Sequence, residues 1–377
     1  MVKEGKKLLG DRNELAKKGG NMGRLTTQNI LKSLVRIPSS TGDAAACQKI
    51  VALSQTLLRS QKVPSKIEIS KNRQILVWGE INLSKSKWLV NSHLDVVPGK
   101  PSQFKPLETK DKILGRGAAD TKGSAAILLS NASSWLNAAK AKRVTFMLVT
   151  DEEMGGESTK EILRKTTNLK GAIFLEPTDE KIITQTKGIM QIKIQTKGKS
   201  CHGSRPWEGI NALEQLTSSL TQFRKKHPNP KNETQNTTFN FSILQAGTAI
   251  NQIPEEATLW CDVRWNSNDS PNKIINELKH TFVESKVEVI KLESPVKCSE
   301  DAKILADFFL TMKQNKLNPI QSFDHGSSDA RHCTARNIPA IIFGPKGKNS
   351  HADNEWVSLK SLDNVGKVLN SWINQLN

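Results

Sequence analysis

The sequence of 377 residues contains no tyrosine, and aromatic residues make up only 5% of it. Proteins that bind single-stranded nucleic acids commonly stack bases on aromatic side chains, so this shortage argues against such a role. Cysteines are also few: five are scattered along the chain, and no two form a Cys-x-x-Cys pair. This pattern indicates neither a disulfide framework nor a thiolate metal site, and we expect small buried thiols in a reducing compartment.

Long apolar runs are missing as well. The longest uncharged stretch, residues 123–139, is interrupted by serine and asparagine and is too short to cross a bilayer comfortably. The first twenty residues carry charges throughout and lack the apolar core of a secretory signal. We therefore expect a cytoplasmic protein with no membrane partner.

Acidic residues are fewer than basic ones: the chain has 37 Asp and Glu and 55 Lys and Arg, which gives a formal net charge of +18. A basic surface attracts phosphate, so one hypothesis is a protein that binds nucleic acid or another acidic surface. The pattern favours a different interpretation, since lysines are spread through nearly every segment and the densest cluster, residues 224–226, is short. We expect solvated faces and a field that favours anionic substrates, and keep nucleic acid as an alternative partner.

The length predicts two domains. Residues 1–24 carry seven Lys or Arg and three acids without a sustained apolar face, which predicts a loose basic extension. An amphipathic helix is expected from Leu25 onward, with Thr26 or Thr27 as its N-cap. It should end before Ile37 and Pro38, because a residue that precedes proline is disfavoured in the helical region.

Four short apolar runs, residues 87–93, 143–150, 171–176 and 339–345, have the pattern of buried strands. Helical stretches such as residues 122–140 lie between them, and this alternation is typical of an α/β fold, a mixed sheet with helices on both faces. Residues 187–293 differ, since their order of strand, helix, strand, strand, helix, strand predicts an inserted two-layer α+β domain of ferredoxin-like type. The first domain would then consist of residues 25–186 and 294–377.

Polar residues stand directly after the apolar runs, and ligands of α/β sheets gather beyond the carboxyl ends of the strands. A further acid lies in a glycine-rich turn before a helix. Two histidines and three carboxylates at one sheet edge suit two divalent ions such as Zn²⁺, with Co²⁺ or Mn²⁺ also acceptable to these ligand types. The segments are His93–Asp95, Gly115–Gly123, Asp151–Gly156, Glu176–Thr178 and His351–Glu355.

In this order the segments resemble those of the M20-type zinc peptidases and deacylases. That group includes succinyl-diaminopimelate desuccinylase, acetylornithine deacetylase, aminoacylase and glutamate carboxypeptidase. The resemblance covers the chain from about Leu25 to its end and implies that Asp120 bridges two metal ions. His93 and Glu176 would complete one site, and Glu153 and His351 the other.

The resemblance also implies roles beside the ligands. Asp95 would accept the second ring N–H of His93 and fix its tautomer. Adjacent side chains point opposite ways in an extended chain, so Glu153 can bind metal while Glu152 faces the cavity as the general base. Glu152 would take a proton from a water between the ions, whose pKa can fall to about 7. The resulting metal-bridged hydroxide would attack an amide carbonyl, and Glu152 would pass the proton to the departing amine.

Within the insertion, residues 200–206 resemble the family's lid segment, whose histidine helps to polarise the carbonyl. Here that residue is His202, and in several dimeric members the histidine reaches the partner subunit's site, so we expect a homodimer through the lid. Asn251 and Arg264 resemble lid residues that hold a substrate carboxylate. Arg331 lies in a segment that resembles the family's segment near the substrate pocket, and it could bind substrate or pair with Asp329.

The resemblance implies a dinuclear metal-dependent amidohydrolase that acts on N-acyl amino acids or short peptides. A dipeptidase or carboxypeptidase of the same family is the alternative, because the chemistry is shared and the pocket shape is not visible in the sequence.

Overall fold

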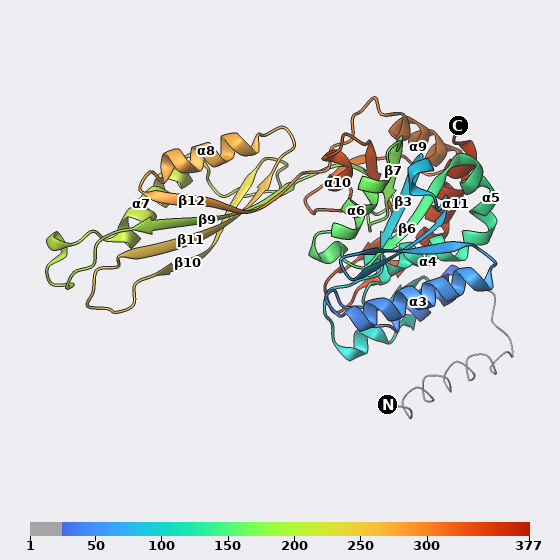
Figure 1. Ribbon diagram of the computed structural model, residues 1–377, viewed down its shortest axis with the longest axis horizontal. Helices are drawn as coiled ribbons and strands as arrows, with labels where there is room; N and C mark the ends of the chain where they lie inside the picture. Colours follow the sequence, from blue (N-terminus) through green and yellow to red (C-terminus); the bar gives the residue numbers. More distant parts are fainter. Residues whose placement is uncertain (1–24) are drawn as a thin grey trace.

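The computed structural model describes residues 25–377, so the prediction of a loose basic extension at residues 1–24 lies outside the described residues. Figure 1 shows a large body built around a central sheet and a smaller unit of strands and helices that projects from it. Strands β9 (Gly188–Lys197) and β12 (Ser285–Glu293) connect the smaller unit to the body.

The body contains an eight-stranded mixed sheet. Strands β6, β3, β7 and β14 at its centre are parallel, whereas β1 and β2 form an antiparallel edge. Across the sheet the strands are β1 (Ser65–Ser70), β2 (Arg73–Gly79), β6 (Val144–Val149), β3 (Trp88–His93), β7 (Gly171–Phe174), β14 (Ala340–Ile342), β8 (Ile182–Thr186) and β13 (Gln321–Asp324).

Two apolar clusters cover the two faces of this sheet, because successive side chains of a strand point to opposite faces. In β3, Trp88 and Val90 belong to one cluster and Leu89 belongs to the other. The first cluster packs against α2 (Thr27–Val35), α3 (Ala44–Ser60), α4 (Gly123–Ser130), α5 (Ala132–Lys142), α9 (Lys303–Gln314) and α11 (Leu359–Gln375). The second packs against α6 (Glu157–Lys165) and α10 (Arg331–Thr334). The expected α/β sheet with helices on both faces is therefore present.

The first predicted helix is confirmed. Helix α2 begins after Thr26, whose hydroxyl accepts a hydrogen bond from the Asn29 amide, and it ends at Val35. The helical stretch expected over residues 122–140 is present and consists of two helices. The chain forms α4 and α5, and Asn131 between them leaves helical geometry and donates its side-chain amide to the Ile127 carbonyl.

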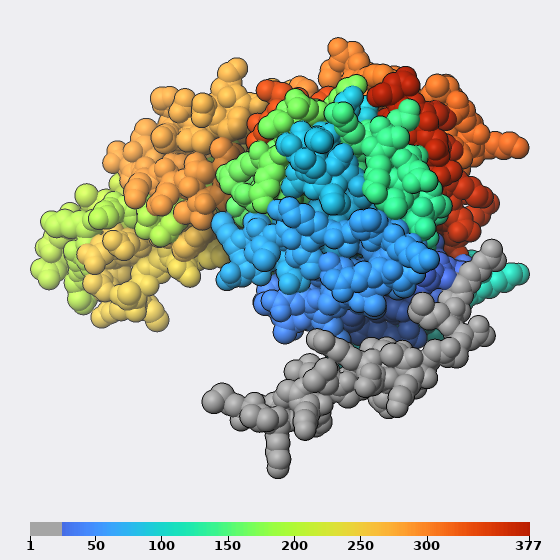
Figure 2. All heavy atoms as spheres, turned by 45° about the vertical axis from the view of Figure 1, so that its right-hand side comes forward, coloured from blue at the N-terminus to red at the C-terminus, as the bar shows by residue number. Residues whose placement is uncertain are grey.

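The smaller unit spans Gly188–Glu293 and has its own apolar core. Its antiparallel sheet has the order β10 (Thr238–Ala246), β11 (Glu256–Trp265), β9 and β12. Helices α7 (Ala212–Lys226) and α8 (Pro271–Thr281) cover one face, where Phe223 and Leu278 pack against alternate residues of β9 and β11. Figure 2 shows the loops near residues 200 and 250 at the end of the unit farthest from the body.

A third, small sheet of four short strands was not predicted. It consists of β15 (Gly347–Lys348), β16 (Trp356–Ser358), β5 (Lys112–Leu114) and β4 (Leu107–Glu108). Its register pairs Trp356 with Leu114, which brings the segment after His351 against the glycine-rich turn at residues 115–123.

All five cysteines are free thiols. Cys47, Cys261, Cys298 and Cys333 are buried, whereas Cys201 in the smaller unit is partly exposed. Among residues 25–377, no helix is long and apolar enough to span a membrane.

Candidate metal centre

Parallel pairing brings the predicted ligand segments to one edge of the central sheet. The register of β3 and β6 sets His93 opposite Val149, and the acidic segment 151–153 follows directly after β6. Strand β7 pairs with β3 on its other side and ends at Phe174, two residues before Glu176. The carboxyl ends of three neighbouring strands therefore carry chemical groups that are far apart in the sequence.

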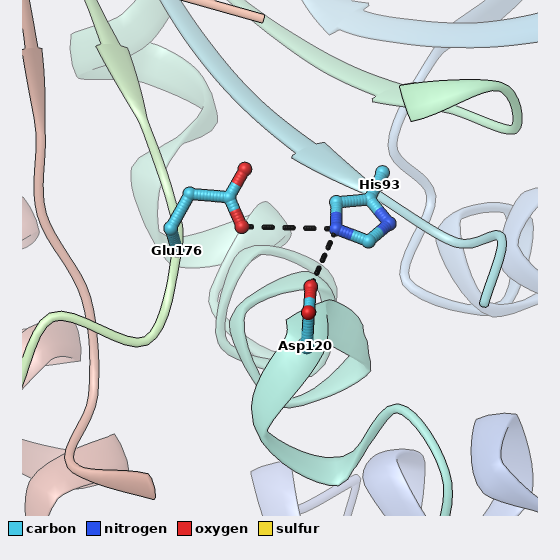
Figure 3. Close-up of side chains that lie close together, drawn as sticks. All are labelled: His93, Asp120 and Glu176. Atoms are coloured by element: carbon cyan, nitrogen blue, oxygen red, sulfur yellow. Dashed lines mark hydrogen bonds and ion pairs between the residues drawn. The ribbon is translucent and has the colours of Figure 1, made fainter. Parts of the chain in front are cut away.

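Three side chains form the first cluster. His93 Nε2 lies 2.9 Å from Asp120 Oδ1 and 3.7 Å from Glu176 Oε2. Figure 3 shows these side chains converging from three elements: β3, the turn before α4, and the chain that follows β7. The His93 side chain is only 2% exposed, so this cluster is closed to bulk water on the histidine side.

A second cluster shares Asp120. His351 Nε2 lies 3.2 Å from Asp120 Oδ2 and 3.1 Å from Glu153 Oε1. Asp120 therefore turns one carboxylate oxygen to each histidine. The His351 side chain is 53% exposed, so the two clusters differ in their access to solvent.

The turn that carries Asp120 depends on glycine. Gly117 has a φ of 79°, in the left-handed region that favours glycine, and a Cβ there would lie 2.6 Å from the Val96 side chain. The next glycine, Gly123, opens α4, and its Cβ would lie 2.5 Å from the Ala118 carbonyl oxygen. This close packing holds Asp120 toward the strand ends.

The charges of the two clusters are strongly linked. Burial opposes ionisation of Asp120, but hydrogen bonds from His351 and His93 outweigh it and hold the pKa of Asp120 well below its usual range. Burial would lower the pKa of His93, yet hydrogen bonds with Asp120, Asp95 and Glu176 raise that pKa well above its ordinary value. The hydrogen bond with Asp120 raises the pKa of His351 to about 9. The carboxylates thus stabilise positive charge at His93 and His351. A bound cation would take the place of the protons on these histidines.

Glu152 and Glu153 do not lie in extended chain as expected. Residues Glu152–Met154 form a 3₁₀ turn, so the argument from alternating side chains does not apply. Asp95 holds this turn, because its carboxylate accepts hydrogen bonds from the Glu152 and Glu153 amides at 3.3 and 3.2 Å. Glu153 reaches His351, whereas Glu152 lies close enough to Glu176 and Asp329 for their charges to act on it.

The expected neighbour of the second ring nitrogen of His93 is Asp95, which offers two acceptors. His93 Nδ1 lies 2.9 Å from the backbone oxygen of Asp95 and 3.5 Å from its carboxylate. The backbone carbonyl is therefore the nearer acceptor of the second ring N–H. The carboxylate is engaged by the Glu152–Met154 turn and by the Thr41 hydroxyl at 2.9 Å.

The environment of Glu152 favours its protonated form. Burial, followed by the negative charges of Asp329 and Glu176, raises the pKa of Glu152 well above its ordinary value. A carboxyl group perturbed in this way, beside a cluster of ligand-type side chains, is typical of an acid/base residue. This raised pKa of Glu152 applies to the metal-free protein, since the positive charge of a bound cation would lower it.

The predicted substrate residues lie apart from the clusters. His202 and Asn251 are exposed in the loops that follow β9 and β10, where residue 202 pairs with residue 252. Arg264 lies near the end of β11 and pairs with Asp262 at 2.7 Å. Among the described residues, the structure brings none of the three into contact with the metal-ligand clusters.

Arg331 is buried and already engaged. Its guanidinium lies 3.3 Å from Glu293, at the end of β12, and 3.5 Å from Asp329. Arg331 therefore has two acidic partners in this conformation, and a contact with substrate stays a prediction. Asp329 in turn accepts a hydrogen bond from Thr159 and packs against Gly156, where a Cβ would lie 1.7 Å from its Oδ1.

The donor set fits a pair of divalent ions. Each cluster offers one imidazole nitrogen and two carboxylate oxygens, all within 4.8 Å of one another, and the shared carboxylate presents a separate oxygen to each. Nitrogen and oxygen ligands of this kind suit Zn²⁺ and similar borderline cations. Two residues near the clusters had no predicted role: Arg116 and Glu355, which form a buried ion pair at 3.0 Å.

A model of a protein family, described as Peptidase family M20/M25/M40, matches residues 89–375. The chain belongs to the M20 peptidase family. Among curated relatives, [LysW]-lysine/[LysW]-ornithine hydrolase of Sulfurisphaera tokodaii is 24% identical over 84% of this chain and 86% of its own. Carboxypeptidase G2 of Pseudomonas is 27% identical over 88% of this chain and 85% of its own. This M20 chain is accordingly a hydrolase of amide or peptide bonds.

Solved structures show the same fold over nearly the whole chain. The aminopeptidase PepT of Bacillus cereus superposes with a TM-score of 0.78 at 18% identity, covering 94% of this chain and 99% of that one. A dinuclear metal-binding M20 peptidase of Bacillus subtilis superposes with a TM-score of 0.67 at 13% identity, covering 92% and 96%. The M20 fold therefore includes the projecting unit as well as the body.

Proposed function

We propose that this M20 protein is a cytoplasmic dinuclear zinc amidohydrolase that cleaves N-acyl amino acids or short peptides. The observation that carries the proposal is the arrangement of Asp120, whose two oxygens face His93 and His351 on opposite sides. A single carboxylate placed between two sets of ligands is what a bridging role requires. Glu176 and Glu153 supply the remaining carboxylate of each set.

The reaction needs a proton carrier beside the metal ions. Two divalent ions, when bound, would acidify a water molecule and polarise the carbonyl of the substrate. Glu152 takes the proton of the attacking water and returns it to the amide nitrogen as the C–N bond breaks. The amine and the carboxylic acid leave as products, and Glu152 is again ionised. Asp95 keeps Glu152 in place through the backbone of the Glu152–Met154 turn.

The preferred substrate is a small anion, because the chain carries a net charge of +18 and two of its predicted contacts are an arginine and an amide. Arg264 and Asn251 would hold the substrate carboxylate, with Arg264 suited to a bidentate contact. The relatives' names include both a carboxypeptidase and a hydrolase of a lysine or ornithine conjugate. A peptidase therefore stands as the alternative to a deacylase, on the same chemistry.

Residues 187–293 would act as a lid and dimerisation domain inserted between the two parts of the catalytic domain, residues 25–186 and 294–377. Strand β10 lies at one edge of the smaller sheet, and it exposes Ile243 and Leu244 near the fully exposed Ile250. An exposed apolar edge strand is suited to pairing with a second copy. Such a homodimer would explain the far position of His202, which would help to polarise the carbonyl in the partner subunit's site.

A hydrolysis screen tests the proposal. The protein, loaded with Zn²⁺, Co²⁺ or Mn²⁺, is offered N-acetyl, N-succinyl and dipeptide substrates beside the Glu152→Gln variant. We expect activity with at least one class, and a loss of at least about 10³-fold in the variant, because the base also generates the nucleophile. Glu157→Gln, which alters a partly exposed glutamate paired with Lys71 and Lys160, is the matched control and should keep full activity. Equal rates for Glu152→Gln and the parent protein would exclude the proposed base.

A further inference from the structure

The carboxylate of Glu355 is buried and accepts four hydrogen bonds. Its Oε2 lies 3.0 Å from Arg116 Nη1 and 2.9 Å from the Gly117 amide. Its Oε1 lies 3.0 Å from the Ala119 amide and 3.1 Å from the Asp120 amide. One side chain therefore fixes the backbone of the whole turn that ends at the shared carboxylate.

Arg116 extends this contact to the other side of the second cluster. Its Nη2 donates to the backbone oxygen of His351 at 3.3 Å, and its Nη1 donates to that of Ala352 at 3.3 Å. The ion pair of Arg116 with Glu355 thus binds the backbone of Asp120 through one partner and the backbone of His351 through the other. Both side chains of the pair are at most 4% exposed.

The two ligands joined in this way have no regular structure of their own to hold them. His351 lies in the loop between β15 and β16, with a φ of 66°, and Asp120 has non-helical backbone angles inside its turn. His93, by contrast, ends a buried strand of the central sheet. The distance between Asp120 and His351 therefore depends on contacts outside the elements that carry them.

We propose that the Arg116–Glu355 pair is a positioning element for the second metal site. It sets the affinity of the Asp120, Glu153 and His351 cluster for its cation and has a much smaller effect on the His93, Asp120 and Glu176 cluster. The inference rests on the proposed dinuclear function. Groups that orient metal ligands in this way typically change metal affinity by about 10–100-fold when they are replaced.

Titration of the metal-free protein with Zn²⁺ alone, in competition with a chromogenic chelator, tests this inference. The His351→Ala variant first identifies the binding step that belongs to the second cluster. In Glu355→Gln we expect that step to weaken by about 10–100-fold, while the other step changes by less than about threefold. Arg116→Met combined with Glu355→Gln removes both buried charges together and should give the same selective loss. The double variant is included because Glu355→Gln alone leaves Arg116 buried without a charged partner, which can prevent folding.

Glu68→Gln is the matched control, because Glu68 is also a largely buried glutamate with two basic partners, Lys66 and Lys165, but lies on edge strand β1. It should leave both zinc steps unchanged. Folded variants that lose both steps equally, or neither, would overturn the inference while the proposed function stands. A parent protein that does not bind two zinc ions would overturn both together.

Discussion

The two halves of the metal centre share Asp120 but are built differently. The His93 half is carried by strands, since its buried histidine ends β3 and Glu176 follows β7. The His351 half lies on a loop and a 3₁₀ turn, and its histidine is half exposed. Strands are held by the ladder of the sheet, whereas the loop ligands rely on Asp95 and on the Arg116–Glu355 pair. The first half is therefore positioned by the sheet, and the second by side-chain contacts to loop backbone.

The largest expected effect comes from the group that belongs to both halves. Asp120→Asn should abolish binding of both ions and lower activity by more than about 10³-fold, because the acid/base chemistry also depends on the ions. Zinc content after gel filtration and the hydrolysis rate measure the two effects. Asp111→Asn, at an exposed residue of the body, should behave like the parent. A variant of Asp120 that retains two tightly bound ions would contradict the bridging role.

Replacing the histidine of one half should change the stability of the protein by a different amount from replacing the histidine of the other half. His93→Ala leaves the partly buried Asp120 and Glu176 without their shared partner, and we expect a loss of about 1–3 kcal/mol in the free energy of unfolding of the metal-free protein. His351→Ala should lose less, because solvent can replace its exposed imidazole. Urea unfolding in the presence of a chelator measures both variants. Equal losses would contradict the proposed effect of solvent access at the two histidines.

Chelation should remove the two ions at different rates. The ion at the His351 half is closer to solvent and should leave first, which predicts two phases in the release of zinc to an excess of chelator. Activity should fall with the first phase, since Glu152 acts beside a centre that needs both ions. A single phase in which both ions leave together would contradict the difference in access.

The smallest effect is a pH dependence of the metal-free protein. The pKa of His351 is raised to about 9 by its hydrogen bond with Asp120. A raised histidine pKa stabilises the folded protein fully below the unfolded value of about 6.5, and this contribution is lost as pH rises through about 9. The melting temperature should therefore fall slightly between pH 7 and pH 10, because an exposed group is screened by water. His351→Ala should remove that part of the pH dependence, and an unchanged profile would contradict it.

The fold of the body could be predicted largely because its central strands are short, apolar and bounded by charged or turn residues. The family order of the ligand segments likewise identified the residues that converge around Asp120. Contacts through the backbone could not be predicted in this way. The donation of the His93 ring to a main-chain oxygen and the 3₁₀ turn at Glu152–Met154 depend on local geometry that residue types do not encode.

Other features were missed because their signals are weak. Strands of two or three residues, such as β15 and β16, are too short to show an alternating pattern. Glu355 was visible only as the last residue of a segment that begins with a histidine, and its role depends on pairing with a turn 239 positions away.

The distribution of thiols gives the protein one accessible point for chemical labelling. Burial raises the pKa of Cys47 and Cys298 to about 11 and that of Cys261 to about 12, so these side chains stay protonated and shielded near neutral pH. Cys201 is the partly exposed thiol, and it lies at the far end of the projecting unit. A fluorophore coupled by maleimide would therefore report the position of that end relative to a second dye on the body, without any cysteine being replaced.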